Sequence, residues 1–193
     1  RDSAWKAQRD IEEFERLLER TRTWLETSRG AFEQVAVETS VDVQVSDNVR
    51  VRGRVDRLER DGDGALYVVD LKTGSTAPTK KEIGEHAQLL TYQLALAHGT
   101  FDGERVVTAR GESDITVGGA MLVFPKKDTK AITVLEQAAK TPEELAEFAE
   151  AIDTLPAEMT GPTLLATTGK HCDRCSVRAL CPVQPEGEMI HNV

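Results

Sequence analysis

Hydrophobic residues recur along this chain with two different periods, and each period predicts a different kind of element. In residues 2–29 they lie about 3.6 positions apart with charged residues between them, which predicts an amphipathic helix ending at Gly30. In residues 35–45 apolar and polar positions alternate, which predicts a half-buried strand. The apolar face of the helix is Trp5, Ile11, Phe14, Leu17, Leu18, Trp24 and Leu25, and that of the strand is Val35, Val37, Thr39, Val41, Val43 and Val45.

Two further strands are expected directly after the first. The turn at residues 46–48 leads into a second alternating stretch, and the Asp-Gly-Asp-Gly turn at residues 61–64 leads into a third strand over residues 66–72. Strands joined by such short turns predict an antiparallel meander over residues 35–72. On the second strand Val49, Val51, Gly53 and Val55 are expected to face the core, and Arg50, Arg52, Arg54 and Asp56 the opposite side.

The second half of the chain mixes helices and strands. Thr79 and Glu82 form a capping-box motif that opens a helix over residues 79–98, and Thr141 followed by Pro142 opens another over residues 141–155. The other elements expected are a short strand at 105–108 within a loop-like stretch, 100–115, and strands at 117–124 and 130–135.

This mixed order predicts the α/β class, with a mixed central sheet flanked by helices. We expect residues 1–165 to form the core and residues 166–193 to form an irregular, cysteine-rich tail. The chain of 193 residues, with 39% hydrophobic and 30% charged residues, is long enough for one domain with a sizeable core.

Charge and segment composition exclude several classes of protein. The net charge of −9 argues against a protein that passively coats DNA, but it does not exclude an enzyme that acts on DNA. No window approaches the ~18 apolar residues of a membrane span, and residues 1–9 do not resemble a signal peptide. Because the chain begins without Met inside a helical pattern, we expect it to be part of a longer protein.

Two carboxylates and an amine are expected to meet at the ends of adjacent strands. Asp70 and Lys72 are two positions apart on the third strand and so share a face, and Asp56 lies across the hairpin from them. Carboxylates so close repel each other unless a cation lies between them, and Mg²⁺ prefers oxygen ligands. The backbone carbonyl of Leu71 and the side chain of Glu38 are further candidate ligands, whereas the alternative for the Asp–Lys pair is a weak surface ion pair.

Four arginines, Arg50, Arg52, Arg54 and Arg57, concentrate beside Asp56. They suit contacts to DNA phosphates, for which we consider Arg52, Arg54 and Arg57, and they equally suit a solvated strand face.

Three motifs in order give the chain a family resemblance. The segments G-R-V-D, V-V-D-L-K-T-G and Q-L-L-T-Y resemble motifs I, II and III of the RecB-like branch of the PD-(D/E)xK nucleases. The resemblance implies a restriction-endonuclease-like fold, Asp56 and Asp70 as ligands of Mg²⁺ or Mn²⁺, and Lys72 as the catalytic lysine. It also implies that Gln88 and Tyr92, on one helix face, lie beside the site.

The chain departs from this family at one position. The family usually carries a histidine metal ligand on a helix before the first strand, and residues 1–34 contain none. We expect that ligand upstream of residue 1, with His86 as an alternative.

The spacing C-x2-C-x5-C of Cys172, Cys175 and Cys181 predicts a metal or cluster site, and therefore a reducing cytoplasm, rather than a disulfide framework. It resembles the tail of the iron–sulfur nucleases of this branch, which implies a 4Fe-4S cluster whose fourth cysteine lies upstream. The alternatives are zinc with His171 as fourth ligand, and three unliganded cysteines.

The resemblance is to AddB-type nuclease domains at the C-terminal end of UvrD-family helicase–nuclease subunits, such as those of actinobacterial AdnAB. It implies a DNA nuclease, with exonuclease action expected, that processes double-strand breaks. Its partners would be single-stranded DNA, a helicase motor and a second helicase–nuclease subunit, with no membrane. The alternatives are a degenerate nuclease fold that binds DNA or docks a subunit, and a stand-alone exonuclease of the CRISPR-associated RecB-like type.

Overall fold

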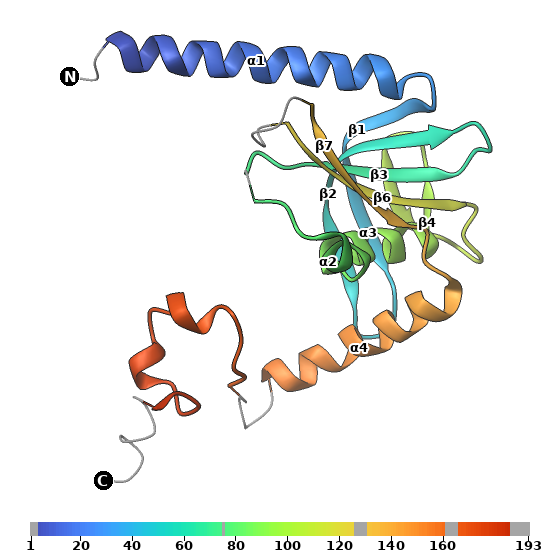
Figure 1. Cartoon of the computed structure of the whole chain (residues 1–193). Helices are drawn as coiled ribbons and strands as arrows, with labels where there is room; N and C mark the ends of the chain where they lie inside the picture. Colours follow the sequence, from blue (N-terminus) through green and yellow to red (C-terminus); the bar gives the residue numbers. More distant parts are fainter. Residues whose placement is uncertain (1–3, 75, 126–130, 161–165, 186–193) are drawn as a thin grey trace. The chain divides into compact units, whose positions relative to one another are not determined.

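A mixed seven-stranded sheet, in the order β4-β5-β1-β2-β3-β6-β7, forms the centre of the compact unit over residues 1–153 (Figure 1). The computed structural model describes residues 4–74, 76–125, 131–160 and 166–185. The strands are β1 (Phe32–Gln44), β2 (Arg50–Asp61), β3 (Leu66–Leu71), β4 (Gly99–Phe101), β5 (Arg105–Thr108), β6 (Val117–Phe124) and β7 (Thr133–Ala138). The pairs β1–β5 and β3–β6 are parallel and the other neighbours antiparallel, so the predicted α/β fold with a mixed sheet is confirmed.

The helices are α1 (Ala4–Ser28), α2 (Lys80–Gly84), α3 (Ala87–Ala97) and α4 (Pro142–Thr160). The predicted meander is present as β1, β2 and β3. The strands predicted at residues 105–108 and 117–124 are found with those bounds, whereas β4 was not expected. The start predicted for the last strand, at residue 130, lies outside the described residues.

The helix predicted over residues 79–98 is two helices in the structure. The Thr79 capping box is present, since its side chain accepts from the backbone of Glu82 and Glu82 reaches back to the backbone of Thr79. The chain then leaves helical geometry at Glu85 and His86, and His86 adopts an extended conformation as the N-cap of α3. The single-helix prediction is therefore wrong at this break, which the continuous helical pattern did not reveal.

The alternation predicted for the first strand also fails at one point. Val37 is 55% exposed, although Val41, Val43 and Val45 are buried as expected. Glu38 has a φ of +50°, which is rare for a residue with a side chain, and the pairing of β1 with β2 shifts between Gln34 and Ala36. These irregular steps change which face each side chain occupies.

Both faces of the central strands are buried. Leu58, Val68 and Leu122 belong to the main core with Leu89 and Leu94 of α3. Val69 and Val123, which follow Val68 and Leu122 in sequence, belong to a second cluster. Trp24, Phe32 and Tyr67 pack against this cluster. The rings of Phe32 and Tyr67 meet edge to face, with centroids 5.0 Å apart.

Two buried amides tie the middle of α3 to strand β7. Gln93 and Gln137 are 0% and 2% exposed, and Gln93 Nε2 donates to Gln137 Oε1 at 2.9 Å. Gln137 Nε2 in turn donates to the carbonyl of Ile83 at 2.8 Å. Because each amide is buried, these bonds hold α2, α3 and β7 in one arrangement.

Residues 154–193 form the second compact unit. Helix α4 crosses into it and continues through Pro156 to Thr160, whereas the proline led us to expect an end at residue 155. The cysteine region consists of two 3₁₀ turns, η1 (Cys172–Arg174) and η2 (Arg178–Leu180). No helix within the described ranges is long and apolar enough to cross a membrane.

Candidate active site

Asp56, the first of the predicted carboxylates, lies just beyond the paired part of strands β2 and β3. The last paired residues at this end of the two strands are Arg57 and Val69. Beyond it, Asp56 Oδ2 accepts a hydrogen bond from the backbone N–H of Leu71 at 2.7 Å. The Asp56 side chain therefore bonds to the residue directly after Asp70, and the two acidic residues meet at one corner of the sheet.

Asp70 and Lys72 form an ion pair that Gln88 holds from the other side. Asp70 is 5% exposed, and its Oδ2 lies 2.6 Å from Lys72 Nζ. Gln88 Nε2 donates to Asp70 Oδ1 at 2.8 Å, while Gln88 Oε1 accepts from Lys72 Nζ at 2.7 Å. The amide thus contacts both members of the pair with the correct polarity for an ionised carboxylate and a protonated amine.

Tyr92 extends this network to strand β2. Its hydroxyl accepts from Gln88 Nε2 at 3.0 Å and donates to the carbonyl of Arg54 at 3.3 Å. Gln88 and Tyr92 are four residues apart on α3 and so lie on one face of the helix. The five residues predicted as catalytic, Asp56, Asp70, Lys72, Gln88 and Tyr92, therefore lie around one corner where β2, β3 and α3 meet.

A match to a family model accompanies this geometry. The model of the PD-(D/E)XK nuclease superfamily matches residues 1–182.

The chain belongs to this superfamily.

Two other comparisons add less. No relative matches among curated proteins. Among solved structures, the chain is similar to the one titled "Crystal structure of SSO0001", with 17% identity, a TM-score of 0.42, and coverage of 94% of this chain and 72% of that chain.

The donor atoms of this member of the superfamily fit a divalent cation. Asp70 Oδ2 is buried and accepts no properly aligned hydrogen bond from the described residues, its neighbour being the Lys72 amine of the ion pair. No three side chains of His, Cys, Asp or Glu within the described ranges are grouped so that they could hold a metal alone. A cation here would therefore rely on the Asp56 and Asp70 carboxylates together with backbone, water and phosphate oxygens, as Mg²⁺ commonly does.

His86 lies at the break between α2 and α3, near the ion pair. Burial, followed by the charge of Lys72, lowers the pKa of His86, and Asp70 offsets part of this shift. Its Nδ1 is buried and has no hydrogen-bond partner among the described residues. The neutral imidazole is thus favoured, with one ring nitrogen that the described residues leave unsatisfied.

Glu38, the additional candidate ligand, lies across the hairpin from Asp56. Val37 pairs with Arg57 and Thr39 with Val55, so Glu38 is opposite Asp56 at the irregular step of β1. Its side chain is 65% exposed and lies 3.5 Å from Arg54.

The arginines predicted to contact DNA fall into two groups. Arg52 and Arg54 are 66% and 65% exposed, and their ion pairs with Asp42 and Glu38 lie in solvent. Arg57 is 12% exposed and bonds to the buried Glu59 carboxylate and to Gln34. A phosphate contact by Arg57 is at odds with this position, because the side chain would have to abandon a buried carboxylate.

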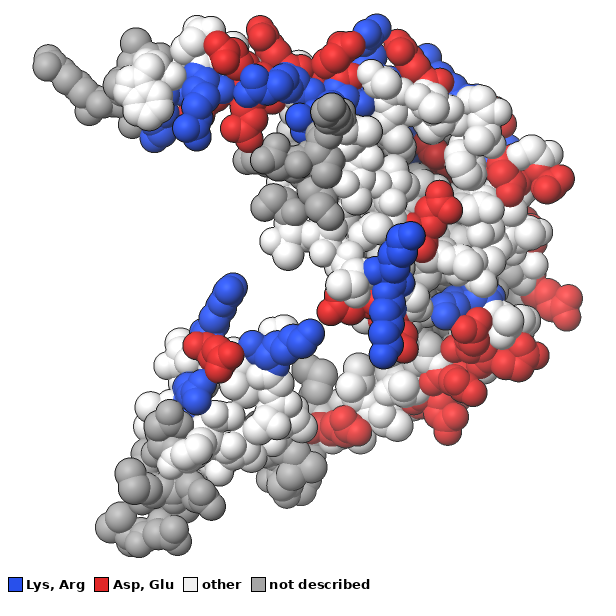
Figure 2. Space-filling model, viewed as in Figure 1, with Lys and Arg blue, Asp and Glu red and all other residues white. Residues whose placement is uncertain are grey.

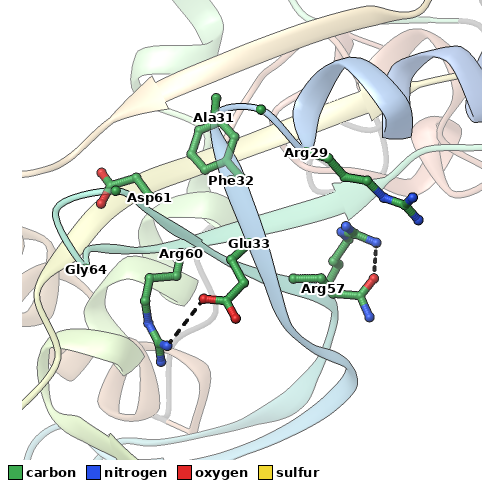
Figure 3. A pocket seen from close by; sticks show the side chains of 11 residues that line it. Arg29, Ala31, Phe32, Glu33, Arg57, Arg60, Asp61 and Gly64 are labelled. Carbon is green, nitrogen blue, oxygen red and sulfur yellow. Dashed lines mark hydrogen bonds and ion pairs between the residues drawn. The ribbon is translucent and has the colours of Figure 1, made fainter.

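A large surface hollow lies at the start of β1, and its lining includes none of the five residues predicted as catalytic. It encloses about 850 Å³ and is lined by the turn before β1 and the turn after β2, with Arg29, Arg57 and Arg60 among its residues. Figure 3 shows Arg60 paired with Glu33, and Arg57 bonded to a neighbouring amide. Acidic and basic side chains are mixed here, so charge does not favour one class of ligand.

The three cysteines of the tail have free thiols in short turns. Cys172 begins η1, Cys175 directly follows η1, and Cys181 directly follows η2. The backbone N–H of Gly169 lies 3.3 Å from the Cys172 sulfur. As described, the thiols do not form a ligand set by themselves, and the chain contains no fourth cysteine.

Proposed function

We propose that this chain is the module of a helicase–nuclease that hydrolyses DNA phosphodiester bonds with Mg²⁺ or Mn²⁺ during double-strand break processing. The observation that carries the proposal is the Asp70–Lys72 pair held by Gln88, with Asp56 bonded to the backbone beside it. Membership of the PD-(D/E)XK superfamily supports hydrolysis of phosphodiester bonds as the reaction.

Asp56, Asp70 and the Leu71 carbonyl are proposed to hold the cation, with Glu38 as a further oxygen donor. A divalent cation, when bound, supplies Lewis-acid stabilisation of the charge that builds up on the phosphate. Lys72 is proposed to neutralise a phosphate oxygen or to orient the attacking water. Its ammonium group is already fixed by Gln88 and Asp70, so little reorganisation is needed when substrate arrives.

Arg52 and Arg54 are proposed to contact the DNA backbone close to this corner. Their present ion pairs are exposed, and exposed ion pairs are weak, so a phosphate can replace the carboxylate at small cost. Arg54 also connects to the site through its carbonyl, which accepts from Tyr92.

The substrate is proposed to be a single strand delivered by a helicase motor, with a second helicase–nuclease subunit alongside. The net charge of −9 supports this, because an acidic module attracts free DNA poorly and benefits from a motor that brings the strand to it.

Removal of divalent cations is expected to abolish cleavage. The full-length protein that contains this chain should degrade labelled single-stranded DNA with Mg²⁺ or Mn²⁺ and should lose this activity in a chelator, because the carboxylates alone cannot stabilise the phosphate charge. Restoring the cation in excess serves as the control. Cleavage that persists in the chelator would contradict the proposal.

The cysteine tail is proposed to bind a 4Fe-4S cluster, with a fourth cysteine from outside this sequence and zinc as the competing metal. The free thiols of Cys172, Cys175 and Cys181 in two adjacent turns support a thiolate site. Iron and acid-labile sulfide measured on the full-length protein should approach four of each per chain. Stoichiometric zinc without iron would contradict the cluster.

A further inference from the structure

One buried amide on β7 contacts the helix break that comes directly before Gln88. The side chain of Gln137 is buried, and its Nε2 donates to the carbonyl of Ile83 at 2.8 Å. The carbonyls of Gly84 and His86 lie 3.3 and 3.4 Å from the same nitrogen. Carbonyls at the end of a helix have no partner within that helix. Gln137 therefore supplies donors to the end of α2 and to the N-cap of α3.

The oxygen of the same amide holds the middle of α3. Gln137 Oε1 accepts from Gln93 Nε2 at 2.9 Å, and Gln93 Oε1 accepts from the backbone N–H of Lys140, just after β7, at 2.9 Å. Gln93 is fully buried, so water does not compete for these bonds. Strand β7 thus holds α3 at its start and in its middle, and two such attachments fix both the position and the rotation of the helix.

The place of Gln88 on α3 makes its amide sensitive to both attachments. Gln88 is in the first turn of the helix, and the N-cap His86 makes no side-chain capping bond that would fix this turn. A side chain extends about 5–6 Å from the helix axis, so a rotation of α3 by about 10° would move the Gln88 amide by about 1 Å. A shift of this size would break its bond to Asp70 or to Lys72, which are now 2.8 and 2.7 Å long.

The neighbouring strand fixes the other side of this contact. The backbone N–H of Lys72 donates to the carbonyl of Val123 on β6 at 2.8 Å. Strand β6 pairs with β7, with Ala120 opposite Gln137. The two paired strands therefore hold the two partners: β6 holds Lys72, and β7 holds Gln88 through Gln137.

We propose that Gln137 is a positioning residue for cleavage at the corner of Asp70 and Lys72. It fixes the start of α3 against β7 and thereby places the Gln88 amide between the carboxylate and the amine. Gln137 acts through Gln88, because its own hydrogen bonds go to Gln93 and to the helix break. This inference rests on the proposed function, since it requires a reaction at this corner.

The test is Gln137→Met, which keeps the length of the side chain and removes both of its hydrogen-bonding groups. Single-turnover cleavage of labelled single-stranded DNA by the full-length protein, with saturating Mn²⁺, is expected to slow by about 10- to 100-fold, because a misplacement of about 1 Å can have this effect. The Kd for DNA should change by less than about twofold, since the substrate-binding groups are unaltered.

Val134→Ala is the matched control on the same strand. Val134 packs against the second cluster, whose described members include none from α3, so its truncation weakens β7 without changing the helix break. Neither substitution changes the charged surface in Figure 2, so the attraction of DNA is the same in both variants. In Val134→Ala a loss of folded protein would lower the amplitude of cleavage, and the rate constant should stay within about twofold of the original.

A double substitution separates positioning from a general structural role. Adding Gln137→Met to Gln88→Met should slow cleavage by no more than about twofold further, because the residue that Gln137 positions is already gone. Circular dichroism shows whether Gln137→Met folds. If it does not fold, Gln93→Met replaces it in the same cycle, since this change removes the bond to the middle of α3 and leaves Gln137 at the break.

Two results would overturn the inference: an unchanged rate constant in Gln137→Met, or losses from Gln88→Met and Gln137→Met that multiply in full. Either result, with the original protein cleaving DNA, counts against the positioning role alone. An original protein without cleavage in Mg²⁺ or Mn²⁺ would refute the proposed function, and this inference with it.

Discussion

Asp70→Asn is expected to lower the rate of DNA cleavage by about 10³-fold or more while the chain remains folded. Asparagine keeps the shape of the side chain and can still accept from Gln88 Nε2 at the position of Oδ1. It removes the negative charge that is proposed to hold a divalent cation, and with the cation would go several kcal/mol of transition-state stabilisation. Single-turnover cleavage of labelled single-stranded DNA by the full-length protein measures the loss, with helicase activity as a check that the motor is unaffected.

The matched control for this change is Asp47→Asn. Asp47 is an exposed carboxylate in the turn between β1 and β2, so its loss of charge should leave the rate within about twofold. If Asp70→Asn cleaved DNA like the unaltered protein, the assignment of the metal site to this corner would be wrong.

Lys72→Met is expected to lower the cleavage rate by about 10²- to 10³-fold but to preserve binding of the cation. The ammonium group pairs with Asp70 and Gln88, and no other Lys or Arg forms an ion pair with Asp70 among the described residues. Without the ammonium group, the Asp70 carboxylate has no positive charge beside it and attracts a cation more strongly. The affinity for Mn²⁺ should therefore stay the same or rise. Calorimetric titration with Mn²⁺ and single-turnover cleavage separate the two effects.

Lys80→Met provides the comparison, because Lys80 is an exposed residue at the start of α2. It should change neither measurement. Loss of Mn²⁺ binding with Lys72→Met would mean that the lysine supports the cation site structurally rather than acting on the substrate.

Local patterns predicted most strands of this fold because their causes are local. The apolar run of β6 and the turn at residues 61–64 are local features of the sequence, and both lead to the expected elements. The break at Glu85 and His86 could not be read this way, since both flanking segments have helical patterns. Val37 is exposed because the backbone at Glu38 has a positive φ, which interrupts the regular alternation of the strand. A count of alternating residues does not detect such an interruption.

Contacts between distant residues account for what was missed around the site. The bond between Gln93 and Gln137 joins residues 44 positions apart, and neither residue belongs to a motif. Arg57 looked like one more exposed arginine, yet it pairs with Glu59, which is 1% exposed. The order of the motifs predicted Asp56, Asp70, Lys72, Gln88 and Tyr92 as a group, and their spatial proximity arises from the sheet register and the direction of α3.

The two hydrogen bonds of the Gln88 amide restrict which residues can occupy position 88. Its oxygen can only accept and its nitrogen can only donate, so rotation of the amide by half a turn would set donor against Lys72 and acceptor against Asp70. Conversion to glutamate, whether by mutation or by spontaneous loss of the amide, would place two carboxylates side by side at the site. Deamidation of Gln88 would thus disturb its two charged neighbours, Asp70 and Lys72.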